Sequence, residues 1–118
     1  MALEDKAREL GRMIGQSDEY RAVTRANEGL TSDAEATDLL RQMEVLRRGA
    51  QEMLQRGEEP SAEMEKQLDD LLEKVQVNPA YQRVAVAQEN LDKVMRLVND
   101  WISDGISKGA QSSIITLG

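Results

Sequence analysis

Apolar residues recur along this chain at alternating steps of three and four, which is the spacing of a single stripe on an α-helix. The first segment shows this pattern at Leu3, Ala7, Leu10 and Ile14. A second, shorter helix is predicted to begin after Ser17, whose hydroxyl can cap it, and to run to about Glu28. Gly29 then fits a helix C-terminus in the left-handed conformation. The N-terminal quarter of the chain is therefore predicted to hold two helices.

The most regular stripe lies between Ala34 and Arg56 and consists of Ala36, Leu39, Met43, Leu46, Ala50 and Met53. Gly57 is expected to end this helix, and Pro60 or Ser61 to begin the next one. The returning helix carries a matching stripe, formed by Met64, Leu68, Leu71 and Val75. Because a connection this short makes the two helices antiparallel neighbours, their stripes are predicted to face each other.

The last helix is predicted to begin at Asn78-Pro79, since Asn78 is steered out of the helical region and can cap the first turn of that helix. Its broad apolar face comprises Val84, Ala87, Leu91, Val94, Met95, Val98, Trp101 and Ile102. A helix reaching Ser107 has a length of about 43 Å at 1.5 Å per residue, more than the width of a compact globule of this size. Gly105 and Gly109 are expected to weaken its end. We therefore expect one domain over residues 1–110 and a flexible or docking tail over residues 111–118.

The pattern as a whole predicts an all-α fold of about five helices, with a long antiparallel hairpin and a long C-terminal helix. The two longest stripes exceed what one chain of 118 residues can cover, so a dimeric helical bundle is the leading interpretation. The alternative is an intramolecular core of four or five helices. The residues predicted to form the core or dimer interface are Leu39, Met43, Leu46, Ala50, Met53, Leu68, Leu71, Leu91, Met95, Val98, Trp101 and Ile102.

Charge and composition disfavour several classes of partner. The chain holds 22 acidic and 15 basic residues, a formal net charge of −7, so its average field repels phosphate backbones and anionic lipid. We therefore expect no direct nucleic-acid contact. No apolar run approaches the length of a membrane span or a signal peptide, and the charged start MALEDKARELGRM fits neither. The expected location is the cytoplasm, without membrane binding.

Candidate chemistry is sparse, because the chain contains neither Cys nor His. We expect no catalytic, cofactor or metal site, since the usual nucleophiles, bases and soft ligands are missing. Three acidic clusters are assigned to helix starts, turns and solvated faces: Asp33, Glu35 and Asp38; Glu58 and Glu59; Asp69, Asp70 and Glu73. A carboxylate-dependent metal hydrolase stays a remote alternative, needing a metal bound by Asp and Glu alone. The basic run Arg47-Arg48, beside Glu44 and Glu52, is interpreted as an ion-paired surface rather than an RNA track.

In its order of motifs the chain resembles the YlbF/YmcA family of small bacterial helical regulators. The resemblance rests on the Ser17-Asp18-Glu19-Tyr20 helix start, Asp33-Ala34-Glu35-Ala36 before Leu39-Leu40, Gly57-Glu58-Glu59-Pro60-Ser61, Asn78-Pro79, and Val98-Asn99-Asp100-Trp101-Ile102-Ser103. It implies a helical, dimer-forming protein without enzymatic activity. In better-known members it also implies a part in a complex that tunes messenger RNA processing, affecting competence, sporulation and biofilm formation. Those members are associated with cysteine-ligated iron–sulfur clusters, so this cysteine-free chain looks nearer the YheA-like branch.

The leading hypothesis is a homodimeric helical adaptor, without enzymatic activity, that presents its long helices to a larger regulatory complex. The rival within the same class is a purely structural dimer whose tail docks elsewhere. Trp101 is expected to anchor a core, with a docking point for a partner as the alternative.

Overall fold

A computed structural model of the protein covers residues 1–117, with side chains described for residues 1–111. Across residues 1–117 the chain forms five α-helices and no strand. The helices are α1 (Ala2–Gly15), α2 (Asp18–Ser32), α3 (Ala34–Gln55), α4 (Ala62–Val77) and α5 (Pro79–Leu117). The predicted all-α class, the hairpin and the long C-terminal helix are confirmed.

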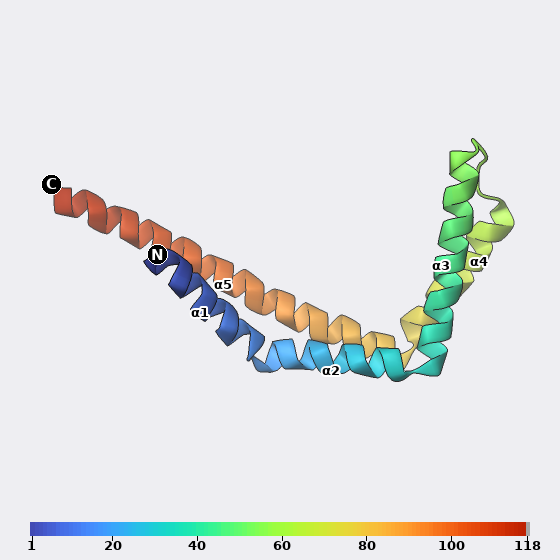
Figure 1. Ribbon diagram of the computed structural model, residues 1–118, viewed down its shortest axis with the longest axis horizontal. Coiled ribbons are helices and arrows are strands. Elements are labelled where there is room, and N and C mark those ends of the chain that lie inside the picture. The colour runs from blue at the N-terminus through green and yellow to red at the C-terminus, as the bar shows by residue number, and fades with distance from the viewer. Residues whose placement is uncertain (118) are drawn as a thin grey trace.

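The five helices form an elongated, bent molecule rather than one bundle (Figure 1). The α3–α4 hairpin points away from a long limb in which α2 lies along the first part of α5 and α1 lies farther out (Figure 1). The principal extents are 69 × 36 × 24 Å, and the radius of gyration is 22.1 Å. A compact chain of this length has a radius of gyration of about 13.5 Å. The chain therefore does not form the single intramolecular core of four or five helices that was the alternative prediction.

Side-chain caps define four of the five helix starts. In each, a side-chain oxygen accepts a hydrogen bond from the backbone N–H three residues later, which satisfies one of the unpaired donors of the first turn. The caps are Ser17, Asp33, Ser61 and Asn78, with donor–acceptor distances of 3.2, 2.9, 3.2 and 3.0 Å. The predicted caps at Ser17 and Asn78 are confirmed, and of the two candidates at the hairpin it is Ser61 that caps α4.

The predicted end of α2 at Gly29 is wrong. Gly29 lies inside α2, which continues to Ser32. The hydroxyls of Thr31 and Ser32 donate to the carbonyl oxygen of Glu28 at 3.0 and 2.9 Å, so these polar residues are satisfied within the helix. Asp33 then adopts an extended backbone and is both the C-cap of α2 and the N-cap of α3. By contrast, the predicted helix end at Gly57 is confirmed, because α3 ends at Gln55 and Gly57 follows in the left-handed region with a φ of 78°.

The glycines near the C-terminus do not end α5. Its helical backbone runs through Gly105 and Gly109 as far as Leu117. The tail predicted to fray or dock therefore has a helical backbone to that residue. The side chains of Ile114, Ile115 and Leu117 lie outside the described side chains, so the role of this tail stays a prediction.

Two small cores replace the single core of a bundle. In the hairpin, Leu39 of α3 packs with Leu71 and Val75 of α4, and Met43 and Leu46 pack partly buried against them. In the limb, α2 packs on α5 and covers its first turns. The buried apolar side chains of α5 are Ala80, Ala87, Leu91 and Val98. The predicted facing of the hairpin stripes is confirmed.

Candidate functional site

An open apolar groove runs along the α3–α4 hairpin, and we refer to it as the hairpin groove. Its apolar lining consists of Leu40, Met43, Leu46, Ala50, Leu54, Pro60, Met64, Leu68 and Leu72. Leu54 is 61% exposed, whereas Leu40, Leu68 and Leu72 are each 37% exposed. A groove with apolar walls contributed by two helices has the shape that accepts an amphipathic helix.

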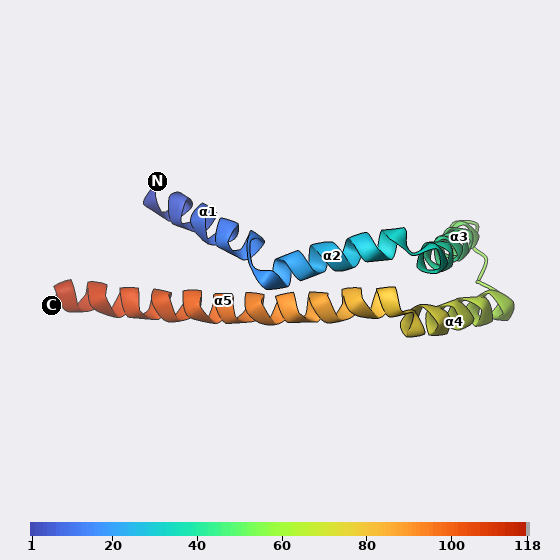
Figure 2. The same ribbon diagram turned by 90° about the horizontal axis from the view of Figure 1, so that it is seen from below.

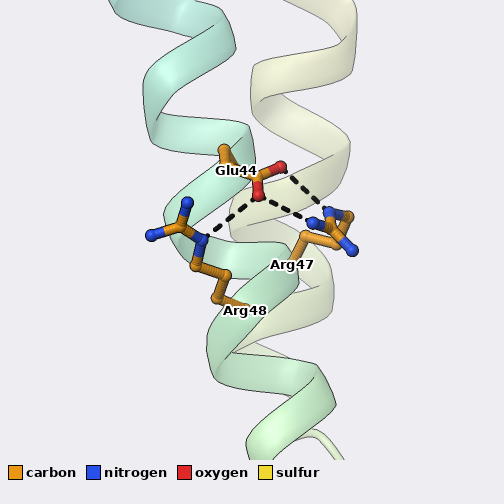
Figure 3. A network of polar contacts seen from close by, with 3 residues as sticks. All are labelled: Glu44, Arg47 and Arg48. Atoms are coloured by element: carbon orange, nitrogen blue, oxygen red, sulfur yellow. Dashed lines mark hydrogen bonds and ion pairs between the residues drawn. The ribbon is translucent and has the colours of Figure 1, made fainter.

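Glu44 and two arginines form an ion-paired network on α3 beside this groove (Figure 3). Arg47 donates to both carboxylate oxygens of Glu44, at 2.9 Å from Nε and 2.7 Å from Nη2, and the Nε of Arg48 donates at 3.2 Å. The hydrogen bonds from Arg47, followed by its charge and the contacts of Arg48, lower the pKa of Glu44 to about 2. The interpretation of Arg47-Arg48 as an ion-paired surface is confirmed.

A second set of exposed apolar side chains lies on α1 and α5 of the limb, and we refer to this set as the arm surface. It comprises Leu3 and Met13 of α1 and Leu97, Trp101, Ile102 and Ile106 of α5. Their exposed fractions range from 46% at Ile102 to 70% at Leu3. Figure 2 shows α1 leaning away from α5, so the two helices diverge instead of covering each other. Several large apolar side chains exposed along the same pair of helices favour an interaction surface over a solvated one.

The residues predicted for the core or dimer interface fall into three groups in the single chain. The buried ones are Leu39, Leu71, Leu91 and Val98; the half-buried ones are Met43, Leu46, Ala50 and Met53; the exposed ones are Leu68, Met95, Trp101 and Ile102. The expectation that Trp101 anchors a core is not met within one chain, where its side chain is 64% exposed. Whether these residues meet a second copy stays a prediction.

The sequence interpretation missed two members of the arm surface, Leu97 and Ile106, which are 48% and 67% exposed. The signal was present, because Leu97 precedes Trp101 by four residues and Ile106 follows Ile102 by four. The expected weakening of the helix at Gly105 kept the stripe from being extended that far.

The chemistry of the described residues is limited. Over the residues whose side chains are described, no group of three or more His, Cys, Asp or Glu is placed to hold a metal ion. Within the same part of the chain, no helix combines the length and the apolar character needed to cross a membrane. The features that stand out are thus the hairpin groove and the arm surface.

Sequence comparison places the chain among known relatives. Residues 3–107 match the family model described as "Control of competence regulator ComK, YlbF/YmcA". A UPF0342 protein of Streptococcus agalactiae serotype V is 32% identical over 98 residues, covering 77% of this chain and 88% of the relative. A UPF0342 protein of Leuconostoc citreum is 24% identical over 103 residues, covering 87% of each chain.

Structural comparison gives the same fold. A chain in the crystal structure of Bacillus subtilis RicA in complex with RicF superposes with a TM-score of 0.80 at 19% identity, covering 92% of this chain and 96% of that one. A Bacillus stearothermophilus protein of unknown function (DUF964) superposes with a TM-score of 0.64 at 18% identity, covering 91% and 94%. The fold is shared with these proteins. The match over residues 3–107 shows that the chain belongs to the YlbF/YmcA family.

Proposed function

We propose that this protein is a cytoplasmic, homodimeric helical adaptor that acts through protein–protein contacts and not through catalysis. The observation that carries the proposal is the amount of surface that the single chain leaves in water. The chain exposes 9228 Å², whereas a compact monomer of 13.2 kDa exposes about 6,400 Å². The exposed residues include many large apolar side chains, among them Leu54, Trp101 and Ile106. Exposure of such side chains to water is unfavourable, so we expect the chain to associate with other chains.

The presence of two separate apolar surfaces supports an adaptor over a simple dimer. The hairpin groove and the arm surface lie on different limbs of the bent molecule (Figure 1). One surface can serve a second copy of the chain while the other binds a different protein. We assign the hairpin groove to a helix of another protein. A structural neighbour of the same fold was crystallised in complex with a different protein, which supports a hetero-partner for this chain.

The cellular role that we propose follows from the family. Its model concerns control of a competence regulator. We propose that this chain likewise belongs to a multiprotein assembly that tunes messenger RNA processing and developmental traits. In this role the protein supplies binding surfaces, and the chemistry belongs to its partners.

Two measurements test the adaptor proposal. Sedimentation velocity at micromolar concentration should show a dimer. A pull-down from the native cytoplasm, analysed by mass spectrometry, should then compare the wild type with Leu54→Asp, which places a charge in the hairpin groove at an already exposed position. Gln55→Asp is the matched control, since it adds the same charge to the same end of α3 without lining the groove.

The expected result is that the wild type and the Gln55 variant recover the same partner and that the Leu54 variant loses it. Equal recovery by all three would show that the hairpin groove binds no partner. A monomer across the micromolar range would contradict the dimer.

A further inference from the structure

The second half of α5 extends beyond the part that α2 covers, and α1 diverges from it (Figure 2). With 39 residues, α5 is about 58 Å long, whereas the 15 residues of α2 that pack on it span about 22 Å. The helix α1 leans away from α5, and none of its residues is buried (Figure 2). Over the described residues, the second half of α5 therefore lacks a cover from its own chain.

The exposed fractions of the apolar side chains along α5 show where the intrachain packing ends. Leu91 and Val98 lie on the buried stripe and are 9% and 6% exposed. Trp101 and Ile102 continue that stripe three and four residues beyond Val98, yet they are 64% and 46% exposed. The apolar pattern thus extends past the point where the intrachain packing stops. An uninterrupted stripe that is buried at one end only is the mark of a helix that is completed by another chain.

Two glycines on the same stripe give an independent indication. Gly105 lies seven residues after Val98, and Gly109 lies four residues farther on, both inside α5. Glycine in a helix interior is less favourable than alanine. A Cβ atom added at either position would meet nothing within 4 Å, so no contact within the described structure requires a glycine there. Small residues on an apolar helix face do, however, let a second helix approach closely.

We propose that the face of α5 that carries Trp101, Gly105 and Gly109 packs against the second half of α5 from a second copy of this chain. Gly105 and Gly109 lie at the closest approach, and Trp101 is buried beside them. The inference rests on the homodimer proposed above and adds the surface through which it forms. A two-fold axis lets each copy give its α5 and receive the other's. The result is a four-helix arrangement of α1 and α5 from both chains.

Area and charge favour a second copy as the occupant. The excess exposure of about 2,800 Å² per chain is well above the roughly 800 Å² that each partner contributes to a standard interface. The chain carries a net charge of −7, which opposes self-association in general. The segment of α5 from residue 93 to residue 111 is an exception, because its charged residues nearly balance: Lys93, Arg96, Asp100, Asp104 and Lys108. Two copies of this segment can therefore approach without strong repulsion.

The sole tryptophan of the chain allows a test on the wild-type protein. Trp101 fluorescence and acrylamide quenching are measured over a dilution series, with sedimentation velocity on the same samples. In the dimer, the emission should be shifted to the blue and the quenching constant reduced several-fold. Both should change to the values of an exposed tryptophan at the concentration where the dimer dissociates. A dimer in which Trp101 is as quenchable as in the monomer would overturn the inference while leaving the homodimer intact.

A monomer at every concentration would overturn the homodimer and this inference together, so the two failures are distinguishable.

A second test uses the glycines. Gly105→Ala should increase helicity by circular dichroism and yet weaken self-association by about tenfold or more, because a methyl group at a close helix contact is overpacked. Gly29→Ala is the matched control, since Gly29 is also a helix-interior glycine with open space around its Cβ position. It should increase helicity without changing self-association.

Unchanged self-association in Gly105→Ala would place the contact elsewhere. The hairpin variant Leu54→Asp should remain a dimer, because the proposed surface lies on the other limb. Dissociation of that variant would move the self-interface to the hairpin groove and overturn the inference.

Discussion

The hairpin and the limb are built from the same kind of apolar stripe, but they differ in how well their helices match in length. In the hairpin, α3 and α4 have 22 and 16 residues, and a short connection makes them antiparallel neighbours of similar length. In the limb, 39 residues of α5 meet 15 residues of α2. The hairpin therefore closes on a core of its own, while the second half of α5 stays bare. Matching of lengths, and not the pattern alone, decides which stripe is buried.

The two regions also differ in what they leave exposed. The hairpin groove contains several leucines that are about one-third exposed, as at Leu40, Leu68 and Leu72. On the arm surface, Trp101 and Ile106 are about two-thirds exposed. A moderately exposed groove on a closed hairpin suits transient binding of a partner. An extended bare helix suits a permanent partner, because its exposure in the free chain is more unfavourable.

The largest expected effect comes from breaking the core of the hairpin. Leu71→Ala should lower the free energy of unfolding by about 2–5 kcal/mol, since the side chain is 7% exposed and packs with Leu39 and Val75. Its neighbour Leu72, 37% exposed, is the matched control, and Leu72→Ala should have a much smaller effect. Urea unfolding followed by circular dichroism measures both. Equal losses would mean that the hairpin has no core distinct from its groove.

The next effect concerns the turn that makes the hairpin antiparallel. Gly57 has a φ of 78°, in the region that costs an L-residue with a Cβ atom about 1–2 kcal/mol. Gly57→Ala should lower the free energy of unfolding by that amount. Gly57→Asn should lower it less, because asparagine tolerates the left-handed conformation. A neutral Gly57→Ala would show that the turn can relax without disturbing the hairpin. Thermal melts of the three proteins provide the comparison.

A somewhat smaller effect is expected at the joint between the two regions. Asn78 is 3% exposed, and its Oδ1 accepts from the backbone N–H of Tyr81 at 3.0 Å at the start of α5. Asn78→Ala should cost about 1 kcal/mol through loss of the cap. The Nδ2 group is buried and has no hydrogen-bond partner among the residues whose side chains are described. Asn78→Ser therefore keeps an acceptor and removes this unsatisfied amide donor. The serine variant should therefore melt above the alanine variant, and the reverse order would contradict the capping role.

The smallest effect is a pH dependence of the Glu44 network on α3, beside the hairpin groove. The Arg47 and Arg48 contacts lower the pKa of Glu44 from 4.5 to about 2. A lowered pKa stabilises the folded state above the unfolded pKa, and that contribution is lost as the pH falls from 4.5 toward 2. The melting temperature of Glu44→Gln should lie slightly below that of the wild type at neutral pH, and the difference should shrink as the pH falls toward 2.

Two arginine variants sharpen this last test. Arg47 makes two hydrogen bonds to Glu44 and Arg48 makes one. Arg47→Gln should therefore raise the pKa of Glu44 more than Arg48→Gln does, as measured by NMR titration of the carboxyl carbon. Equal shifts would mean that the network acts through charge alone.

Much of the fold could be predicted from the sequence, because the signals are local. Each cap spans three residues, as from Ser17 to Tyr20, and the left-handed turn depends on the single residue Gly57. The facing stripes of the hairpin followed from a short connection between two periodic segments. The errors arose where a neighbouring residue changed the outcome. Gly29 was taken as a helix end, but Thr31 and Ser32 are satisfied inside the helix and Asp33 provides the break.

The exposed surfaces show what the sequence alone determined and what only the tertiary structure decided. Periodicity placed Trp101, Ile102 and Val98 on one face of one helix, because that placement depends only on the repeat of the α-helix. Periodicity could not predict that Val98 is buried and that Trp101 is exposed. That difference depends on how far the N-terminal end of α2 reaches along α5 and on the direction in which α1 diverges from α5. Both are set by packing between segments far apart in the chain.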